Sequence, residues 1–368
     1  MNKYFKWVLI IVIVILVIAF VFYSNHSRFV TGNEKIQIGA VLPLTGSLAG
    51  MGEQIKDGTT LAVEDINQTN SKKVSVSYED SKMDPKEAIS AVNRLIGSSG
   101  IQYLTVAATP MIVAVQPITE KDRVLLAAVS VSPAVLKNSQ YTFRAFYNQD
   151  QAVEKIVEYI KQHHYQNVSS LLFNMDVLQG EIDAIKAQGV AISHEEKFDL
   201  DQNDFRTQLT KIKAAKPDLV IMFGYGAKLS YVIKQMQELG MQNTHIIGGL
   251  DFLDIINEMR TLPILANTVF TVPSFNVSES SSSLDFNTRF TKRFGMAPNH
   301  FAAYAYDTLN LMYLGITNTD GKPGDVISYL KSLNGYKGVT GTTTLVNGDM
   351  RGDLSFARYK DGVLEAVK

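Results

Sequence analysis

The chain has 368 residues, with 35 Lys and Arg against 36 Asp and Glu, and it contains no cysteine. A chain of this length exceeds one typical hydrophobic core, so two domains are expected. The nearly balanced charge argues against a general nucleic-acid-binding surface, which requires an excess of basic residues. The lack of cysteine excludes disulfides, thiol nucleophiles, zinc–thiolate sites, iron–sulfur clusters and attachment of a lipid anchor through cysteine.

The amino-terminal segment carries the one membrane signal. Residues 8–23 are apolar throughout and follow Lys3 and Lys6. This run is close to the roughly 17–25 residues that a spanning helix needs. Its end shows no pair of small residues typical of a cleavage site, which favours an uncleaved signal anchor over a cleaved signal peptide. Because the basic residues precede the apolar run, we expect residues 1–34 to form an anchor helix and tether, with the remainder of the chain outside the cytoplasm.

Residues 36–67 predict the first unit of the fold. Residues 36–42 are short, apolar and rich in β-branched side chains, as in a buried strand. Pro43 and Gly46 mark a turn, and apolar residues then recur at helical spacing. This is the first half of a βαβ unit, in which ligands bind at the loop beyond the carboxyl end of the strand.

The same alternation continues along the chain and predicts parallel sheets. Asp84 before Pro85 predicts a capped helix start. Asn347 and Gly348 predict a hairpin turn between residues 342–346 and 356–359. Further strands are predicted at residues 74–80, 101–107, 124–129, 168–173, 219–223 and 245–248.

Hydroxyl side chains follow two neighbouring predicted strands. Thr109 precedes Pro110 after the strand at 101–107, and Ser130 and Ser132 precede Pro133 after the strand at 124–129. Both positions read as helix starts, with Thr109 and Ser132 as caps. Free N–H groups and a partial positive charge at a helix start suit a carboxylate. The alternative is that these residues only cap their helices.

The chain resembles the type I periplasmic binding proteins, in particular the leucine and branched-chain amino-acid group. The resemblance begins at Pro43-Leu44-Thr45-Gly46, Gly52, Gly58, Leu61, Ala62, Ile66 and Asn67, and it covers roughly residues 35–365. It implies an α/β fold of two Rossmann-like lobes with parallel sheets, joined by a hinge of three crossings. Lobe 1 would comprise residues 35–145 and 274–337, and lobe 2 residues 146–273 and 338–368.

The resemblance also implies a ligand site. In the family, a serine, a threonine and backbone N–H groups of the two hydroxyl-bearing loops bind the ligand's carboxylate, which here points to Thr109, Ser130 and Ser132. Tyr225 matches the family's aromatic residue that packs on the ligand, and Asp251 matches the acid that receives the ammonium group. The alternatives are a plain surface tyrosine and an acidic helix cap.

The sequence departs from the family pattern at three places. Where the family has glycine-proline-x-serine, this chain has Val106-Ala107-Ala108-Thr109. Where the family has glycine-alanine-threonine, it has Val129-Ser130-Val131. Residues 174–180 contain no tyrosine, where the family places one at a helix start. The ligand is therefore expected to differ from that of the leucine binders.

These features together predict an extracytoplasmic solute-binding protein, not an enzyme. It would capture a small amino-acid-like ligand and deliver it to an ABC permease, acting as a monomer without metal or cofactor. The six histidines lack metal-ligand spacing, and no Walker loop or nucleophile elbow is present. A sensory receptor domain that uses the same cleft is the alternative. A Rossmann-type enzyme is a remote alternative. Gly224 and Gly226 match the first two glycines of a dinucleotide-binding motif, but Leu229 stands at the position of the third.

Overall fold

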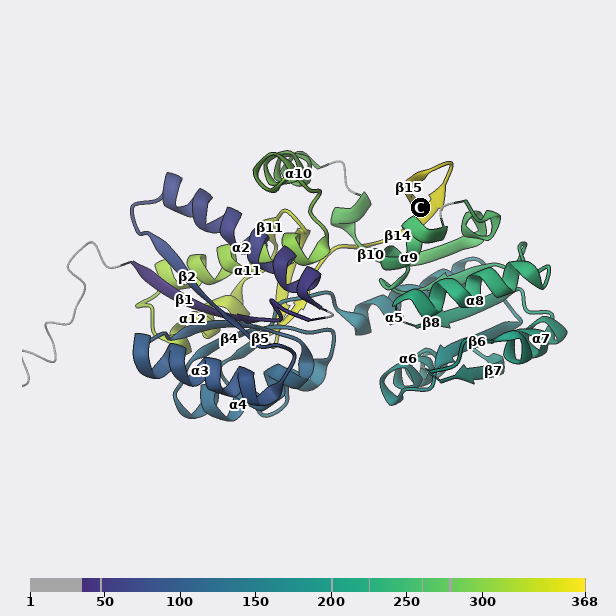
Figure 1. The fold of residues 1–368 in the computed structure, drawn as a ribbon, viewed down its shortest axis with the longest axis horizontal. Coiled ribbons are helices and arrows are strands. Elements are labelled where there is room, and N and C mark those ends of the chain that lie inside the picture. The colour runs from purple at the N-terminus through teal and green to yellow at the C-terminus, as the bar shows by residue number, and fades with distance from the viewer. Residues whose placement is uncertain are drawn as a thin grey trace, which may run out of the picture.

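The chain folds into two α/β lobes, each built on one sheet, in the computed structural model (Figure 1). The structure describes residues 35–46, 48–199, 201–224, 226–259, 261–277 and 280–367. Residues 1–34, which contain the predicted anchor, lie outside this part. No helix within the described residues is long and apolar enough to cross a membrane.

The first lobe contains an eight-stranded sheet of order β11-β12-β13-β5-β4-β3-β1-β2. Its strands are β1 (Ile36–Leu42), β2 (Val74–Asp80), β3 (Tyr103–Ala107), β4 (Leu125–Val129), β5 (Thr142–Arg144), β11 (Tyr336–Gly338), β12 (Gly341–Val346) and β13 (Asp349–Arg351). Its helices are α2 (Ala49–Thr69), α3 (Pro85–Ser99), α4 (Thr109–Lys121), η1 (Pro133–Leu136), α10 (Ser281–Phe294), α11 (His300–Thr317) and α12 (Pro323–Ser332).

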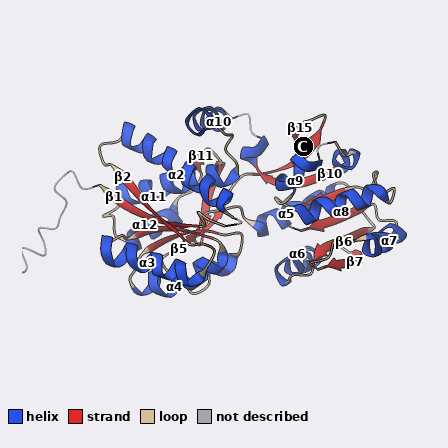
Figure 2. Cartoon of the chain, viewed as in Figure 1, coloured by secondary structure: helices blue, strands red, loops and turns tan. Residues whose placement is uncertain are grey.

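Side-chain alternation along the strands explains why helices cover both faces of this sheet (Figure 2). In β4, Leu126 and Ala128 pack with α3 and α4, whereas Leu125 and Ala127 pack with α11 and α12. On the second face α2 and α11 approach closely at Gly58, where a Cβ atom would lie 2.1 Å from the Ala302 carbonyl oxygen. Asp84 caps α3 as predicted, since its side chain accepts hydrogen bonds from the N–H groups of Lys86 and Glu87.

The second lobe contains a seven-stranded sheet of order β15-β14-β10-β9-β8-β6-β7. Its strands are β6 (Val168–Phe173), β7 (Ile192–Phe198), β8 (Leu219–Phe223), β9 (Ile246–Gly248), β10 (Thr268–Pro273), β14 (Leu354–Lys360) and β15 (Val363–Val367). Its helices are α5 (Gln149–Gln162), α6 (Asp176–Ala187), α7 (Arg206–Ala215), α8 (Gly226–Glu238), α9 (Phe252–Met259) and η2 (Pro263–Asn267), and η3 (Ser274–Val277) follows β10.

Three chain segments cross between the lobes. They lie between β5 and α5, between β10 and α10, and between β13 and β14. Two of them meet where the Ser274 N–H donates to the Asp353 carbonyl oxygen over 2.9 Å. The Tyr147 and Thr271 hydroxyls, 2.6 Å apart, add a buried contact beside the crossings.

The third crossing differs from the predicted boundary after residue 337. Strands β12 and β13 belong to the first sheet, so this boundary is wrong, and the chain crosses at residues 352–353. The reason is the turn between β11 and β12, which α11 holds in the first lobe. Asp307 of α11 is buried and accepts hydrogen bonds from the N–H groups of Val339 and Thr340, at 2.9 and 2.8 Å.

The predicted turn at Asn347 and Gly348 is present, with φ of 54° and 85°. It joins β12 to β13 rather than to residues 356–359. Positive φ at two consecutive positions is the geometry that favours Asn-Gly in a two-residue hairpin.

Candidate functional site

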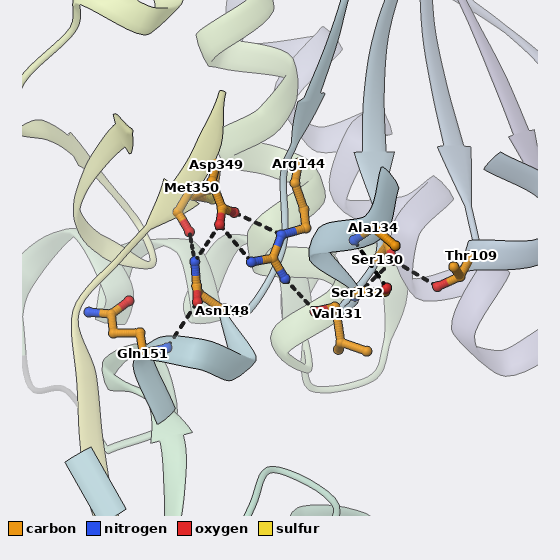
Figure 3. Close-up of polar contacts among 10 residues, drawn as sticks. All are labelled: Thr109, Ser130, Val131, Ser132, Ala134, Arg144, Asn148, Gln151, Asp349 and Met350. Atoms are coloured by element: carbon orange, nitrogen blue, oxygen red, sulfur yellow. Dashed lines mark hydrogen bonds and ion pairs between the residues drawn. The ribbon is translucent and has the colours of Figure 1, made fainter. Parts of the chain in front are cut away.

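The loops beyond β3 and β4 bring the predicted hydroxyl residues together. These strands are parallel neighbours, so their carboxyl ends lie at the same edge of the sheet. The Thr109 and Ser130 hydroxyl oxygens are 2.7 Å apart, and the Ser132 N–H donates to the Ser130 hydroxyl over 3.0 Å (Figure 3). Two hydroxyl side chains and the Ser132 backbone therefore form one polar cluster from two loops.

Their roles as helix caps differ. Ser132 does cap, because its hydroxyl accepts from the Ala134 N–H, although the helix it starts is the four-residue η1. Thr109 is the first residue of α4, so its predicted role as a cap is wrong. Ala108 precedes that helix with a φ of 75°, which is unusual for a residue with a side chain. The methyl group of Ala108 cannot accept a hydrogen bond, and the Thr109 hydroxyl contacts Ser130 instead.

In the second lobe, Asp251 lies in the loop between β9 and α9 and is half-buried. Its Oδ2 atom and the Gln149 Nε2 atom lie 3.8 and 3.9 Å from the point that a Cβ atom of Gly249 would occupy. Both polar groups therefore lie beside Gly249, in ordinary van der Waals range of this position. The negative charge of Asp251 raises the pKa of both Tyr147 and Glu181, so this acid is part of a larger polar group in the second lobe.

Glu181 is a candidate that sequence reasoning missed. It lies on α6 and is only 7% exposed. The pKa of its carboxyl is raised to about 8. Burial is the largest cause, a hydrogen bond with Gln149 opposes it, and the nearby charges of Asp251 and Asp150 add to it. Its Oε2 atom has no hydrogen-bond partner among the described residues.

A signal for Glu181 is present in the sequence. Leu178, Glu181, Ile182 and Ile185 follow the spacing of one helix face, and all four are buried. An ionisable residue on an apolar helix face is a candidate for function, because burying its charge without a partner is costly.

A cavity of about 340 Å³ lies between the lobes. The first lobe contributes Val131, Ser132 and Pro133 to its wall, and helices α5 and α6 of the second lobe contribute the remainder. Among the predicted residues that the structure describes, Ser132 lines this cavity, whereas Thr109, Ser130 and Asp251 do not. Its second-lobe wall consists of Gln149, Asp150, Val153, Glu154, Val177, Gly180, Glu181, Ala184 and Gln188.

A buried ion pair connects the hydroxyl cluster to the hinge (Figure 3). Arg144, at the end of β5, is fully buried and donates to both carboxylate oxygens of Asp349 over 2.7 and 2.8 Å. The same guanidinium donates to the carbonyl oxygen of Val131, which lies between Ser130 and Ser132. Asn148 donates to Asp349 over 3.0 Å. Two crossing segments and the loop after β4 are therefore held by one network.

Tyr225 lies outside the described residues, so its predicted contact with ligand stays a prediction. Within the part of the chain that the structure describes, no group of three or more acidic, histidine or cysteine side chains could hold a metal ion.

Residues 35–363 match a family model described as periplasmic binding protein. The chain belongs to this family. The match covers nearly the whole of both lobes, so the two-lobed α/β fold expected from the sequence is confirmed, as is the family resemblance. The family consists of solute-binding proteins rather than enzymes.

Two relatives and one solved structure show how far this periplasmic binding protein resembles known members. Leu/Ile/Val-binding protein homolog 3 of Brucella melitensis is 28% identical over 58% of this chain and 61% of its own length. Leu/Ile/Val-binding protein BraC3 of Rhizobium johnstonii is 25% identical over 88% of this chain and 91% of its own. The branched-chain amino acid transporter substrate binding protein LivJ from Streptococcus pneumoniae, solved in complex with isoleucine, is 22% identical with a TM-score of 0.75, over 91% of this chain and all of that one.

Proposed function

We propose that this protein binds a free amino acid between its lobes and delivers it to an ABC importer in the membrane. The observation that carries the proposal is the cavity of about 340 Å³, which has the hydroxyl-bearing loop of one lobe on one side and carboxyl groups of the other lobe opposite. A ligand that contacts both lobes favours their closed arrangement. The branched-chain amino acids named for the relatives support an amino acid as the ligand.

The proposed clamp matches the two charged ends of an amino acid. Thr109, Ser130 and Ser132 would receive the carboxylate, with the N–H groups of their loops. Asp251 would receive the ammonium group, and Tyr225 would pack on the body of the ligand. A charge buried without a partner in a closed cleft costs several kcal/mol, so each end of the ligand requires its own polar group.

A thermal-shift screen of the protein with free amino acids tests this function. A ligand at 100 times its dissociation constant adds about 2.7 kcal/mol to the free energy of unfolding, which is a measurable shift. Calorimetry on two variants then tests the clamp. We expect Asp251→Asn to weaken binding by roughly 2–5 kcal/mol, because it removes the partner of a buried charge. We expect Thr109→Ala to weaken it by about 1.5–3 kcal/mol, the typical value of a hydrogen bond to a charged group.

Asp183→Asn serves as the matched control, since Asp183 is an exposed acid on α6 whose contact is Gln179 of the same helix. Wild-type affinity in both Asp251→Asn and Thr109→Ala would show that these residues have structural roles only. Delivery to an importer predicts that deleting the gene abolishes uptake of the same amino acid. Unchanged uptake together with a lost cellular response to the amino acid would instead identify a sensory receptor.

We further propose that the protein acts as a monomer outside the cytoplasm, tethered by residues 8–23. The apolar run without a cleavage site supports this arrangement. We expect mass spectrometry of membrane-extracted protein to find the amino terminus intact. A mature chain that begins near residue 24 would refute the tether.

A further inference from the structure

The ionisable groups that line the cavity between the lobes are all carboxyl groups. They are Asp150, Glu154 and Glu181, and the other lining residues are apolar or neutral. Glu154 is exposed and forms an ion pair with Arg351. Asp150 and Glu181 remain, and no lysine, arginine or histidine lines this cavity.

Glu181 is a lining residue whose hydrogen bonding is incomplete. Its side chain is more than nine-tenths buried, it lines the cavity, and its Oε2 atom has no hydrogen-bond partner among the described residues. Buried polar side-chain atoms are ordinarily paired, so an exception in a cavity wall indicates a missing partner. Within the described residues, no group of three or more His, Cys, Asp or Glu side chains that could hold a metal ion is present around it.

The charges around Glu181 indicate what the partner is. Asp251 and Asp150, from the β9–α9 loop and from α5, are both acidic and raise the pKa of Glu181. The Tyr147 hydroxyl is close enough for its pKa to be affected by Glu181, and it is neutral at physiological pH because burial raises its pKa. The Gln149 amide donates to Glu181. A cationic group with N–H donors would satisfy both the free oxygen and the accumulated negative charge.

We propose that this cavity is a second cation subsite, in which Glu181 binds an amino group on the side chain of the ligand. The inference rests on the proposed function and narrows it to amino acids with a cationic side chain. Asp251 receives the α-ammonium group in the proposed clamp, and its charge acts on Glu181. One ligand of a few carbons can therefore reach both acids, with its methylene groups against Val131, Val153 and Val177 of the cavity wall.

Calorimetry of the detergent-solubilised full chain with L-lysine, L-ornithine and L-norleucine tests the subsite. Norleucine has the shape of lysine without the side-chain nitrogen. We expect lysine or ornithine to bind at least about 30-fold more tightly than norleucine, because a buried charge pair is gained. Glu181→Gln, which keeps the shape of the side chain, should abolish this preference.

Proton release gives a second measurement that does not depend on a variant. Because its pKa is raised to about 8, the carboxyl group of Glu181 is expected to be mostly protonated at pH 7 without ligand, and a bound cation beside it should ionise it. Binding of the diamino acid at pH 7 should then release close to one proton, measured in buffers of different ionisation enthalpy.

Three results would overturn the inference. A wild-type protein that binds norleucine or leucine as tightly as the diamino acids keeps the proposed function but has no cation subsite. A preference for diamino acids that survives in Glu181→Gln, or that is accompanied by no proton release, excludes Glu181. Binding of no free amino acid at all refutes the proposed function itself, and the subsite with it.

Discussion

Replacing Arg144 with methionine is expected to lower the free energy of unfolding by about 3–5 kcal/mol, the usual cost of removing one partner of a buried ion pair. The guanidinium is fully buried, bonds both carboxylate oxygens of Asp349, and also donates to Val131. Methionine keeps much of the apolar stem but leaves Asp349 and the Val131 carbonyl without this donor. Urea unfolding followed by circular dichroism measures the change.

Arg94→Met is the matched control. Arg94 also bonds both oxygens of a carboxylate, that of Glu79, but on an exposed surface. Exposed pairs contribute little to stability, so this control should unfold close to wild type. In the double variant Arg144→Met with Asp349→Leu, we expect much of the loss to be recovered, because no buried charge is left alone. A stability of Arg144→Met equal to that of Arg94→Met would contradict the proposed role of the hinge network.

Replacing Glu181 with glutamine is expected to stabilise the protein at alkaline pH. The pKa of this carboxyl is raised to about 8 from an ordinary value of 4.5, with burial as the largest cause. Between these two values the folded state holds a proton that the unfolded state has released. The stability of the wild type therefore falls as the pH rises through this window, by at most about 1.4 kcal/mol for each pH unit. Glutamine stays neutral and removes this loss.

Urea unfolding of wild type and Glu181→Gln from pH 5 to pH 9 measures the difference. The two free energies of unfolding should be close at pH 5 and diverge by several kcal/mol at pH 9, with the variant more stable. The difference between the two proteins cancels other groups that titrate in this window, such as Asp307, whose pKa burial raises to about 6. The exposed variant Asp183→Asn should follow the wild-type curve. Parallel curves for wild type and Glu181→Gln would mean that the carboxyl is not buried as described.

The hydroxyl cluster contains one feature that position in the chain predicts and one that it does not. That Thr109, Ser130 and Ser132 would lie together followed from position alone, because parallel strands place their carboxyl ends at one edge of a sheet. The hydrogen bond between the Thr109 and Ser130 hydroxyls could not be predicted from position. It depends on α4 starting at Thr109 itself, one residue earlier than predicted, with Ala108 before it at positive φ.

The two-lobed fold was implied by the resemblance to the family. The sequence by itself determined the alternation of strands and helices, the capped start of α3 and the loops that carry polar residues. These features depend on hydrophobic periodicity and on local turn and cap chemistry, which a short segment contains in full. Only the tertiary structure decided that Glu181 faces a cavity, that Arg144 joins the hinge to the loop after β4, and that the third crossing follows β13. Each of these depends on contacts between segments far apart in the chain, such as Arg144 with Asp349 and Asp307 with Thr340. A helix pattern shows which face is buried, but the partner of that face is set by the packing of the whole molecule.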